Sequence, residues 1–405
     1  PLQKHHVVIE GLQPDTIYYY QVLNNDAIVL QEESFKTAKP DSAKKFSFFV
    51  LGDSGVGNEN QKKVNEAMEK SHNNDAADFL IHVGDVHQGD GSSYDDIYFK
   101  VYDSLIRKMN FFLSVGNHDT YTDNSAPYLD DFYLPHNNAD STERYYSFRW
   151  ANAFYLSIDT NLDVKEGSPQ YTFIENELKS ERKNSAMWTF TYFHHPAYCE
   201  YWPEWNGHEG VRTDLLPLFE KYGVDIIFNG HTHAYERGKI FGETYQVITG
   251  GGGGSLDPFG RDVDFITHSE AAFHFSRVDI NDNELTFSAI DVNGNIIDEF
   301  EIEKNVSVKN EEEHLIQKYE FNLQQNYPNP FNPETTIHYQ LSESGFVKLE
   351  VFNMLGKKVQ TLVSKYKPQG NHEVSFDAKS LSSGVYIVRI NTGNYSDEIK
   401  MTLIK

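Results

Sequence analysis

Residues 46–55 read FSFFVLGDSG, a short apolar run that ends in glycine and a possible metal ligand, Asp53. The apolar part has the length of a buried strand. Four later stretches have the same design, and they cover residues 79–85, 111–119, 188–196 and 224–233. Amphipathic stretches at 58–70 and 170–183 separate them and are typical of helices. Strands that alternate with helices predict an α/β layer fold with largely parallel pairing.

The polar residues at the ends of these runs are of the kinds that bind metal ions. In chain order they are Asp53, Asp85, Asn117, His194, His231 and His233. Because ligands of α/β sheets gather at the carboxyl ends of strands, we expect these side chains to meet in one cleft. Carboxylates and imidazoles together favour zinc, iron or manganese over calcium. A shared carboxylate allows two ions to bind side by side, and such a pair can activate water and hold a phosphate group.

Each of these short motifs also occurs as an ordinary turn, but their order along the chain is specific. The motifs are GDSG (52–55), GDVHQGDG (84–91), GNHD (116–119), HHP (194–196) and GHTHAYER (230–237). This series resembles that of the calcineurin-like metallophosphoesterases. The last motif, with no histidine at position 55, is similar to the purple acid phosphatase branch. The resemblance covers about residues 45–303 and implies a β-sandwich flanked by helices that binds two metal ions.

The resemblance also implies a role for each ligand. It assigns Asp53 and His233 to a first metal ion and Asp85 to a bridging position between two ions. The residues that it assigns to the second ion are Asn117, His194 and His231.

Three further histidines lie in or near the motifs. The resemblance implies that His118 hydrogen-bonds the phosphate and stabilises the charge of the transition state. His208, in GHEGVRTD (207–214), is a candidate general acid for the leaving group, because imidazole donates a proton near neutral pH. The alternative for His208 is a solvated loop histidine. His195 is expected to support the ligands from behind.

At one position the residue differs from the one that purple acid phosphatases have. Those enzymes carry a tyrosinate ligand three residues after the bridging aspartate, and here that position is Gln88. Either the amide of Gln88 or the imidazole of His87 is left to complete the first site. Neither is the hard, anionic phenolate that favours ferric iron, so we expect two divalent ions of iron, zinc or manganese rather than Fe(III).

An aromatic segment, YCEYWPEW at 198–205, follows the HHP motif. Its members Tyr201, Trp202 and Trp205 either pack the loop or stack on an aromatic leaving group. The sequence leaves both alternatives open.

The N-terminal segment, residues 1–40, has a different texture. Its stretches GLQPDTIYYYQV and SFKTA resemble the last strands of a fibronectin type III-like sandwich. We expect strands at 6–9, 17–22 and 34–37. Because such a sandwich needs more strands than three, we expect its first half to precede Pro1.

The C-terminal segment is predicted to be all-β and to follow a linker. Residues 304–320 are polar and charged, as linkers are. Residues 321–405 include NLQQNYPNPFNPETTIHYQL and resemble the type A sorting domain of the type IX secretion pathway. That resemblance implies an Ig-like β-sandwich and export by secretion machinery of a Bacteroidota- or Chlorobiota-like bacterium. A generic Ig-like binding module is the alternative.

The composition limits the class of function. The 405 residues are enough for two or three domains, and 60 Asp+Glu against 35 Lys+Arg leave a net charge of −25. That charge argues against a nucleic-acid groove, which needs clustered Lys and Arg. It also repels anionic substrates, so a phosphate site needs local positive charge such as metal ions provide. No apolar run reaches the roughly 20 residues of a membrane span.

These features predict a secreted or cell-surface phosphatase that hydrolyses small phosphate monoesters with metal-activated water. A phosphodiesterase or nucleotidase with the same metal site is one alternative. A non-catalytic cell-surface binding module is another; the intact ligand set argues against it, whereas Gln88 argues for it.

Overall fold

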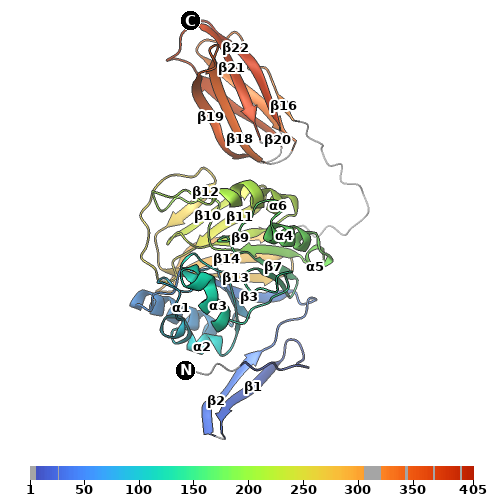
Figure 1. Cartoon of the computed structure of the whole chain (residues 1–405), viewed down its shortest axis with the longest axis vertical. Coiled ribbons are helices and arrows are strands. Elements are labelled where there is room, and N and C mark those ends of the chain that lie inside the picture. The colour runs from blue at the N-terminus through green and yellow to red at the C-terminus, as the bar shows by residue number, and fades with distance from the viewer. Residues whose placement is uncertain (1–5, 26, 305–320, 343–344, 368–369, 393–394) are drawn as a thin grey trace. The chain divides into compact units, whose positions relative to one another are not determined.

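The computed structural model describes residues 6–25, 27–304, 321–342, 345–367, 370–392 and 395–405. The chain divides into two compact units. They are Pro1–Val211 with Tyr222–Val306, and Arg212–Lys221 with Ser307–Lys405. Figure 1 shows sheets and helices together in the central region and strands alone in the C-terminal one. The predicted α/β character of the central region is confirmed.

Two sheets make up the central region within the described residues. The first sheet runs in the order β12 (Ile266–Glu270), β10 (Tyr235–Phe241), β11 (Thr244–Thr249), β9 (Ile226–Asn229), β8 (Trp188–Tyr192), β7 (Ala153–Ser157) and β6 (Tyr146–Trp150). The second sheet runs in the order β15 (Ile296–Glu303), β14 (Glu284–Asp291), β13 (His274–Asn281), β3 (Lys45–Leu51), β4 (Phe79–His82) and β5 (Asn110–Leu113).

Aromatic side chains join the two sheets. The ring of Phe48 on β3 lies 5.6 Å from that of Tyr155 on β7, 5.6 Å from Phe190 on β8 and 6.2 Å from Phe228 on β9. All four side chains are fully buried. Edge-to-face contacts of this kind are favourable beyond the burial of apolar area. The sheets therefore face each other across an aromatic core.

Strand pairing is less parallel than the sequence predicts. The pairs β3–β4–β5 and β7–β8–β9–β11 are parallel, and the remaining strands of both sheets pair antiparallel. Short turns connect the antiparallel pairs β6–β7, β10–β11, β13–β14 and β14–β15, whereas a parallel pair needs a long crossover.

Helices of different lengths separate many of these strands along the chain. They are α1 (Glu59–Asn74), α2 (Asp103–Ile106), α3 (Ala126–Asp131), α4 (Pro169–Lys179), α5 (Glu181–Asn184) and α6 (Leu216–Lys221). The chain also forms π-helices at η1 (Asp95–Phe99) and η4 (Val211–Leu215) and 3-10 helices at η2 (His118–Thr120) and η3 (Asp123–Ser125). The stretch 170–183, expected as one helix, is two helices, because Ser180 is extended and its hydroxyl accepts from Lys183 N to begin α5.

The N-terminal segment contains one hairpin among its described residues, β1 (Ile17–Asn24) paired with β2 (Ala27–Lys36). The strand expected at 34–37 is the end of β2. The strand expected at 6–9 was a wrong prediction, because these residues have no strand partner and a strand forms only by pairing. A single hairpin does not define a sandwich, so the fibronectin type III-like assignment stays a prediction.

The described C-terminal residues form two sheets around a core of their own. One contains β16 (Asn322–Leu323), β17 (Glu334–Leu341) and β20 (Gly370–Asp377). The other contains β19 (Lys358–Lys367), β18 (Gly345–Asn353), β21 (Gly384–Asn391) and β22 (Ser396–Leu403). The Ig-like assignment stays a prediction, and the predicted linker, apart from Lys304, lies outside the described residues.

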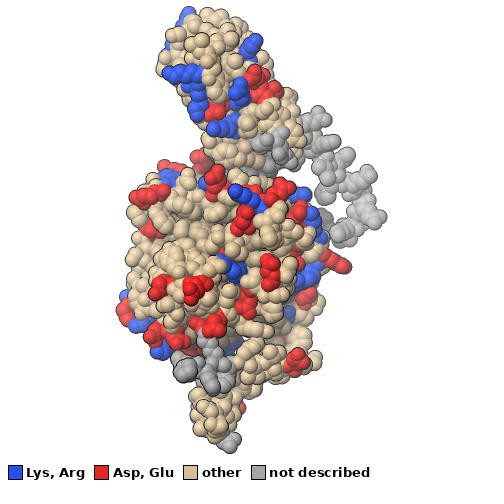
Figure 2. Space-filling model, in the orientation of Figure 1, with Lys and Arg blue, Asp and Glu red and all other residues tan. Residues whose placement is uncertain are grey.

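The distribution of charged side chains on the surface agrees with the net negative charge of the sequence. On the face in Figure 2, acidic side chains are spread over the central region and no continuous basic track crosses it. Among the described helices, none is long and apolar enough to cross a membrane.

Candidate metal centre

The predicted ligands come from the carboxyl ends of strands in both sheets. Asp53 and Asp85 follow β3 and β4, and Asn117 follows β5. His194 follows β8, and His231 and His233 follow β9. Parallel strands end at the same edge of a sheet, and the facing sheets bring both edges together. The structure thereby gathers six residues that are up to 180 positions apart in the sequence.

Several of these residues have a left-handed backbone conformation. Asp53, Asp85 and His231 have φ of 59°, 52° and 69°. Non-glycine residues rarely adopt such values, and strained backbone concentrates at functional sites. The His231 N–H donates to both carboxylate oxygens of Asp53, at 2.9 and 3.1 Å, which holds the two loops together.

Two glycines leave room for the carboxylates. A Cβ on Gly116 would lie 2.1 Å from Asp85 Oδ1, and a Cβ on Gly230 would lie 2.4 Å from Asp53 Oδ2. Both distances are shorter than a van der Waals contact, so the glycines of the GNHD and GHTH motifs are required by the close approach of the loops.

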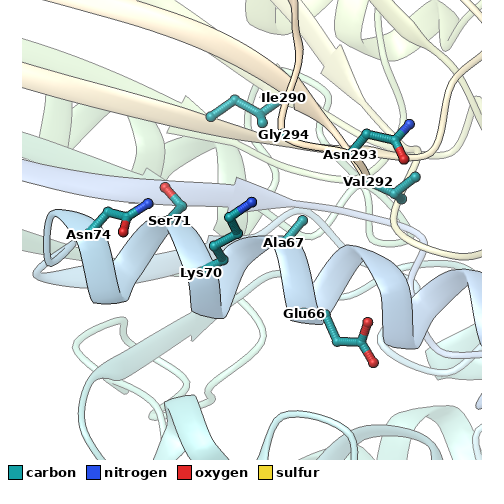
Figure 3. Close-up of a pocket in the computed structure, with 9 residues that line it drawn as sticks. All are labelled: Glu66, Ala67, Lys70, Ser71, Asn74, Ile290, Val292, Asn293 and Gly294. Atoms are coloured by element: carbon teal, nitrogen blue, oxygen red, sulfur yellow. The ribbon is translucent and has the colours of Figure 1, made fainter.

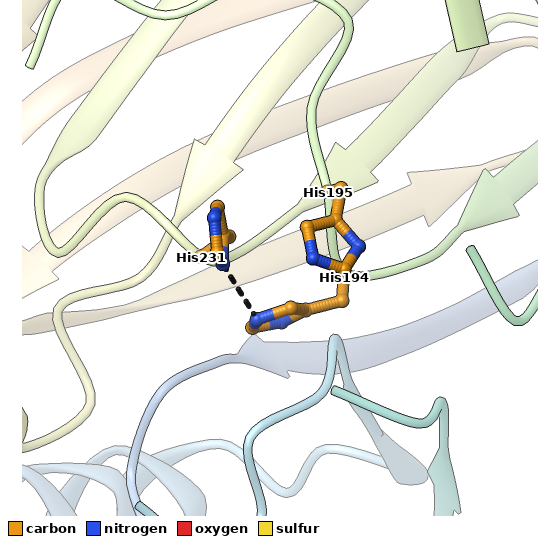
Figure 4. Close-up of side chains that lie close together, drawn as sticks. All are labelled: His194, His195 and His231. Atoms are coloured by element: carbon orange, nitrogen blue, oxygen red, sulfur yellow. Dashed lines mark hydrogen bonds between the residues drawn. The ribbon is translucent and has the colours of Figure 1, made fainter. Parts of the chain in front are cut away.

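Three potential metal-ligand atoms lie close together at one side of the site, in a triangle. Asn117 Oδ1 lies 3.0 Å from His194 Nε2 and 2.9 Å from His231 Nδ1, and the two ring nitrogens are 3.1 Å apart. Figure 4 shows the contact between the His194 and His231 rings. Asp85 Oδ2 is 3.3 Å from His194 Nε2.

The triangle suits a metal ion. His194 Nδ1 lies 3.1 Å from the Val83 carbonyl, which accepts a hydrogen bond and directs the Nε2 lone pair of a neutral ring into the site. Burial and neighbouring His194 lower the pKa of His231 to about 2, so its imidazole is neutral, as a ligand must be. Burial lowers the pKa of His194, but Asp85 and Asp53 outweigh it and raise that pKa to about 9. The buried carboxylates of Asp85 and Asp53 thus favour positive charge nearby, which bound cations would supply.

A second group of donors adjoins the triangle. His233 Nε2 lies 3.5 Å from Asp53 Oδ1, and its Nδ1 donates to the Ser255 carbonyl at 2.7 Å. The amide nitrogen of Gln88 lies 3.2 Å from His233 Nε2, 3.4 Å from Asp53 Oδ1 and 3.5 Å from Asp85 Oδ2. Because the two ends of an amide are assigned by their hydrogen bonds, a half-turn places the Gln88 oxygen in the same position.

His87, the alternative to Gln88, faces away from this group. Its Nδ1 accepts from Gly89 N at 2.7 Å, and its Nε2 lies 3.8 Å from the exposed carboxylate of Asp90. Of the two residues that the sequence left open, the geometry favours Gln88.

The predicted catalytic histidines lie at the edge of the site. His118 N donates to Asp85 Oδ1 at 2.9 Å, and its half-exposed ring has Nε2 4.0 Å from Asp85 Oδ2. The His208 ring lies 5.6 Å from the ring of His195, and its Nδ1 accepts from Val211 N at 3.2 Å. His195 lies behind the ligands, with Nδ1 2.8 Å from the Thr160 hydroxyl and its ring 4.4 Å from that of His231.

Asp119 is a site residue that the sequence reasoning missed, although it belongs to the GNHD motif. Its buried carboxylate accepts from Val86 N, His87 N and Gly116 N at 2.9–3.2 Å and from the Tyr94 hydroxyl at 3.0 Å. It thereby ties the loop of Asp85 to the loop of Asn117.

A hollow of about 440 Å³ lies elsewhere, between α1 and the turn that joins β14 to β15 (Figure 3). Glu66 and Lys70 of α1 and Asn293 of the turn line it, and it contains none of the predicted ligands.

Family comparisons agree with this geometry. Residues 46–235 match the calcineurin-like phosphoesterase family, and residues 325–405 match the secretion system C-terminal sorting domain family. The chain therefore carries a calcineurin-like metallophosphoesterase domain and a sorting domain, which confirms both predicted resemblances.

Within this class, the proteins similar to this chain include purple acid phosphatases. The chain is 27% identical over 300 residues to purple acid phosphatase 23 of Arabidopsis thaliana, covering 64% of each protein. It is 24% identical over 260 residues to Fe(3+)-Zn(2+) purple acid phosphatase 12 of the same plant, covering 61% of this chain and 55% of the relative. The chain thus matches less than two thirds of the length of these relatives.

A solved structure shares the fold. Purple acid phosphatase PPD1 from yellow lupin (Lupinus luteus) seeds superimposes with a TM-score of 0.65 at 22% identity. The match covers 72% of this chain and 60% of the lupin protein.

Proposed function

We propose that the central region, residues 45–303, is a dinuclear metal phosphatase that hydrolyses phosphate monoesters. The observation that carries the proposal is the pair of adjoining donor groups with Asp85 between them: its Oδ2 is 3.3 Å from His194 Nε2 and 3.5 Å from the Gln88 amide. Bound divalent ions supply Lewis acidity and a water of lowered pKa.

The chain's own residues divide the work. One ion would be held by Asp53, His233 and the neutral amide of Gln88. The other would be held by Asn117, His194 and His231. A neutral seventh ligand favours divalent iron, zinc or manganese over Fe(III), in contrast to the Fe(3+)-Zn(2+) relative.

Two histidines at the rim act on the substrate. The His118 ring is oriented by its Nδ1 contact with the Gly89 carbonyl at 2.9 Å, which directs Nε2 toward the site. From there His118 donates a hydrogen bond to the phosphate oxygens as charge builds on them. His208, beside His195, donates a proton to the leaving group.

We also propose that residues 321–405 direct export to the cell surface or medium, after a hairpin segment (1–40), the enzyme domain and a linker (304–320). The match to a sorting domain supports this. In a host with the type IX pathway, removal of residues 321–405 is expected to retain the protein in the periplasm. Normal export of the shortened protein would contradict the assignment.

The enzyme proposal is tested with Asp85→Asn and the matched variant Asp90→Asn, whose carboxylate is 70% exposed at the end of the same motif. Metal content and hydrolysis of phosphate monoesters are measured for both. We expect Asp85→Asn to lose bound metal and turnover, whereas Asp90→Asn retains them. Near-normal hydrolysis by Asp85→Asn would refute the dinuclear site, and hydrolysis by neither wild type nor variant would indicate a binding module.

A further inference from the structure

Two tryptophans pack against the site from the segment after β8. The ring of Trp202 lies 4.8 Å from that of His231, and the ring of Trp205 lies 4.5 Å from it. The two indoles are 6.0 Å apart and only half-buried, so aromatic surface stays open beside the predicted metal ligands. We call Trp202 and Trp205 the aromatic wall.

Polar contacts on two sides hold this wall in place. The carboxyl group of Glu236, 1% exposed, accepts from Glu200 N at 2.6 Å and from Tyr201 N at 3.2 Å. On the other side, the Arg261 guanidinium donates to the carbonyls of Pro203 and Trp205. The loop is therefore organised before any substrate binds, which lowers the entropy lost on binding.

Backbone strain marks Trp202 in particular. Its φ is 67°, a left-handed value that bulky residues rarely adopt, and its N–H donates to the Pro258 carbonyl at 3.0 Å. A loop that only needed filling would tolerate glycine or asparagine at such a position without this cost. Strain of this kind is retained where the side chain serves a site.

We propose that the aromatic wall binds the leaving group of the substrate and selects phosphate monoesters whose alcohol carries an aromatic ring, such as nucleotides and aryl phosphates. The proposal rests on the proposed phosphatase function. Stacking on indole accepts any flat ring, because every such ring has a π face. The net charge of −25 repels anionic substrates at long range, so selection among them must come from local contacts such as these.

The test uses the full chain loaded with metal and two esters, adenosine 5′-monophosphate and ribose 5-phosphate. They share the ester bond between the phosphate and the 5-oxygen of ribose, and ribose 5-phosphate has a hydroxyl group where the adenosine ester has its base. In wild type we expect kcat/KM to favour the adenosine ester by roughly tenfold, the scale of one base–aromatic stack. Trp202→Leu should bring that ratio close to one, whereas Trp202→Phe should retain most of it.

A control variant and a binding measurement distinguish a role of the aromatic wall in binding the leaving group from a general loss of activity. Tyr133→Leu, an exposed aromatic outside the loop, should keep the wild-type ratio. Of the four tryptophans, Trp150 and Trp188 are buried, so quenching of tryptophan fluorescence by adenosine reports on the wall. Equal losses for both esters in Trp202→Leu, or no quenching, would overturn the wall as a leaving-group site. Failure of wild type to hydrolyse either ester would instead overturn the phosphatase proposal.

Discussion

The position of Gln88 predicts how the central region responds to one added charge. The amide nitrogen of Gln88 lies 3.4 Å from Asp53 Oδ1 and 3.5 Å from Asp85 Oδ2. In Gln88→Glu, a carboxylate of the same shape replaces the amide. Without metal it faces two buried carboxylates, and with metal it becomes an anionic ligand. The variant should therefore be destabilised only when the site is stripped of metal.

The distances give the size of the effect. At an effective dielectric constant near 20, each carboxylate pair at these separations repels by about 5 kcal/mol. Burial opposes ionisation of His233, but Asp53 raises its pKa to about 9, so without metal the charged ring, 3.2 Å away, offsets one of the two repulsions. The other repulsion is reduced by the charged ring of His194, 3.3 Å from Asp85 Oδ2, and the cost of protonating a glutamate at pH 7, about 4 kcal/mol, sets the upper limit of the loss. For a region of this size that loss is about 8–16 °C in Tm.

Thermal unfolding in chelator and in excess Zn²⁺ or Mn²⁺ measures the effect. We expect the loss in chelator to shrink to about 1 kcal/mol at pH 5, where protonation costs little, and to vanish in metal. Gln31→Glu, at an exposed position of β2, provides a matched control, and His87→Ala should retain metal. A destabilisation of Gln88→Glu that is the same with and without metal would refute the placement of Gln88 in the site.

Two further predictions concern catalysis and pH. His118→Ala should retain both metal ions and lose roughly 10²–10³ in kcat, which is the scale of one hydrogen-bond donor to the transition state. Metal analysis and steady-state kinetics measure the two effects. Loss of metal would mean that His118 is a ligand instead. Burial raises the pKa of Glu236 to about 8 from 4.5, so the fold favours its neutral form, and the stability that this provides below pH 4.5 is lost as the pH rises to about 8. Glu236→Gln is neutral at every pH, so its free energy of unfolding should not show this loss. Urea unfolding at pH 5, 6.5 and 8 should show the free energy of unfolding of the wild type falling by at most about 5 kcal/mol relative to that of the variant. A difference between the two proteins that does not change with pH would contradict this.

The sequence by itself determined the chemistry of the candidate site. The types of ligand and their positions after apolar runs are local features, because a strand end and the residue that follows it are adjacent in the chain. For the same reason the central strands β3, β4, β5, β8 and β9 could be placed from apolar runs alone. The strand at 6–9 failed because an apolar run forms a strand only when a neighbour pairs with it.

The tertiary structure alone decided which side chains face the site. Gln88 and His87 are neighbours with equal claims in the sequence, and only the path of the loop turns one toward Asp53 and the other toward Gly89. The aromatic wall was likewise undecided, because its contact with His231 and its anchor at Glu236 join residues about 30 positions apart. Such contacts depend on left-handed backbone and on loops that follow different strands meeting in space, and neither leaves a periodic signal in the chain.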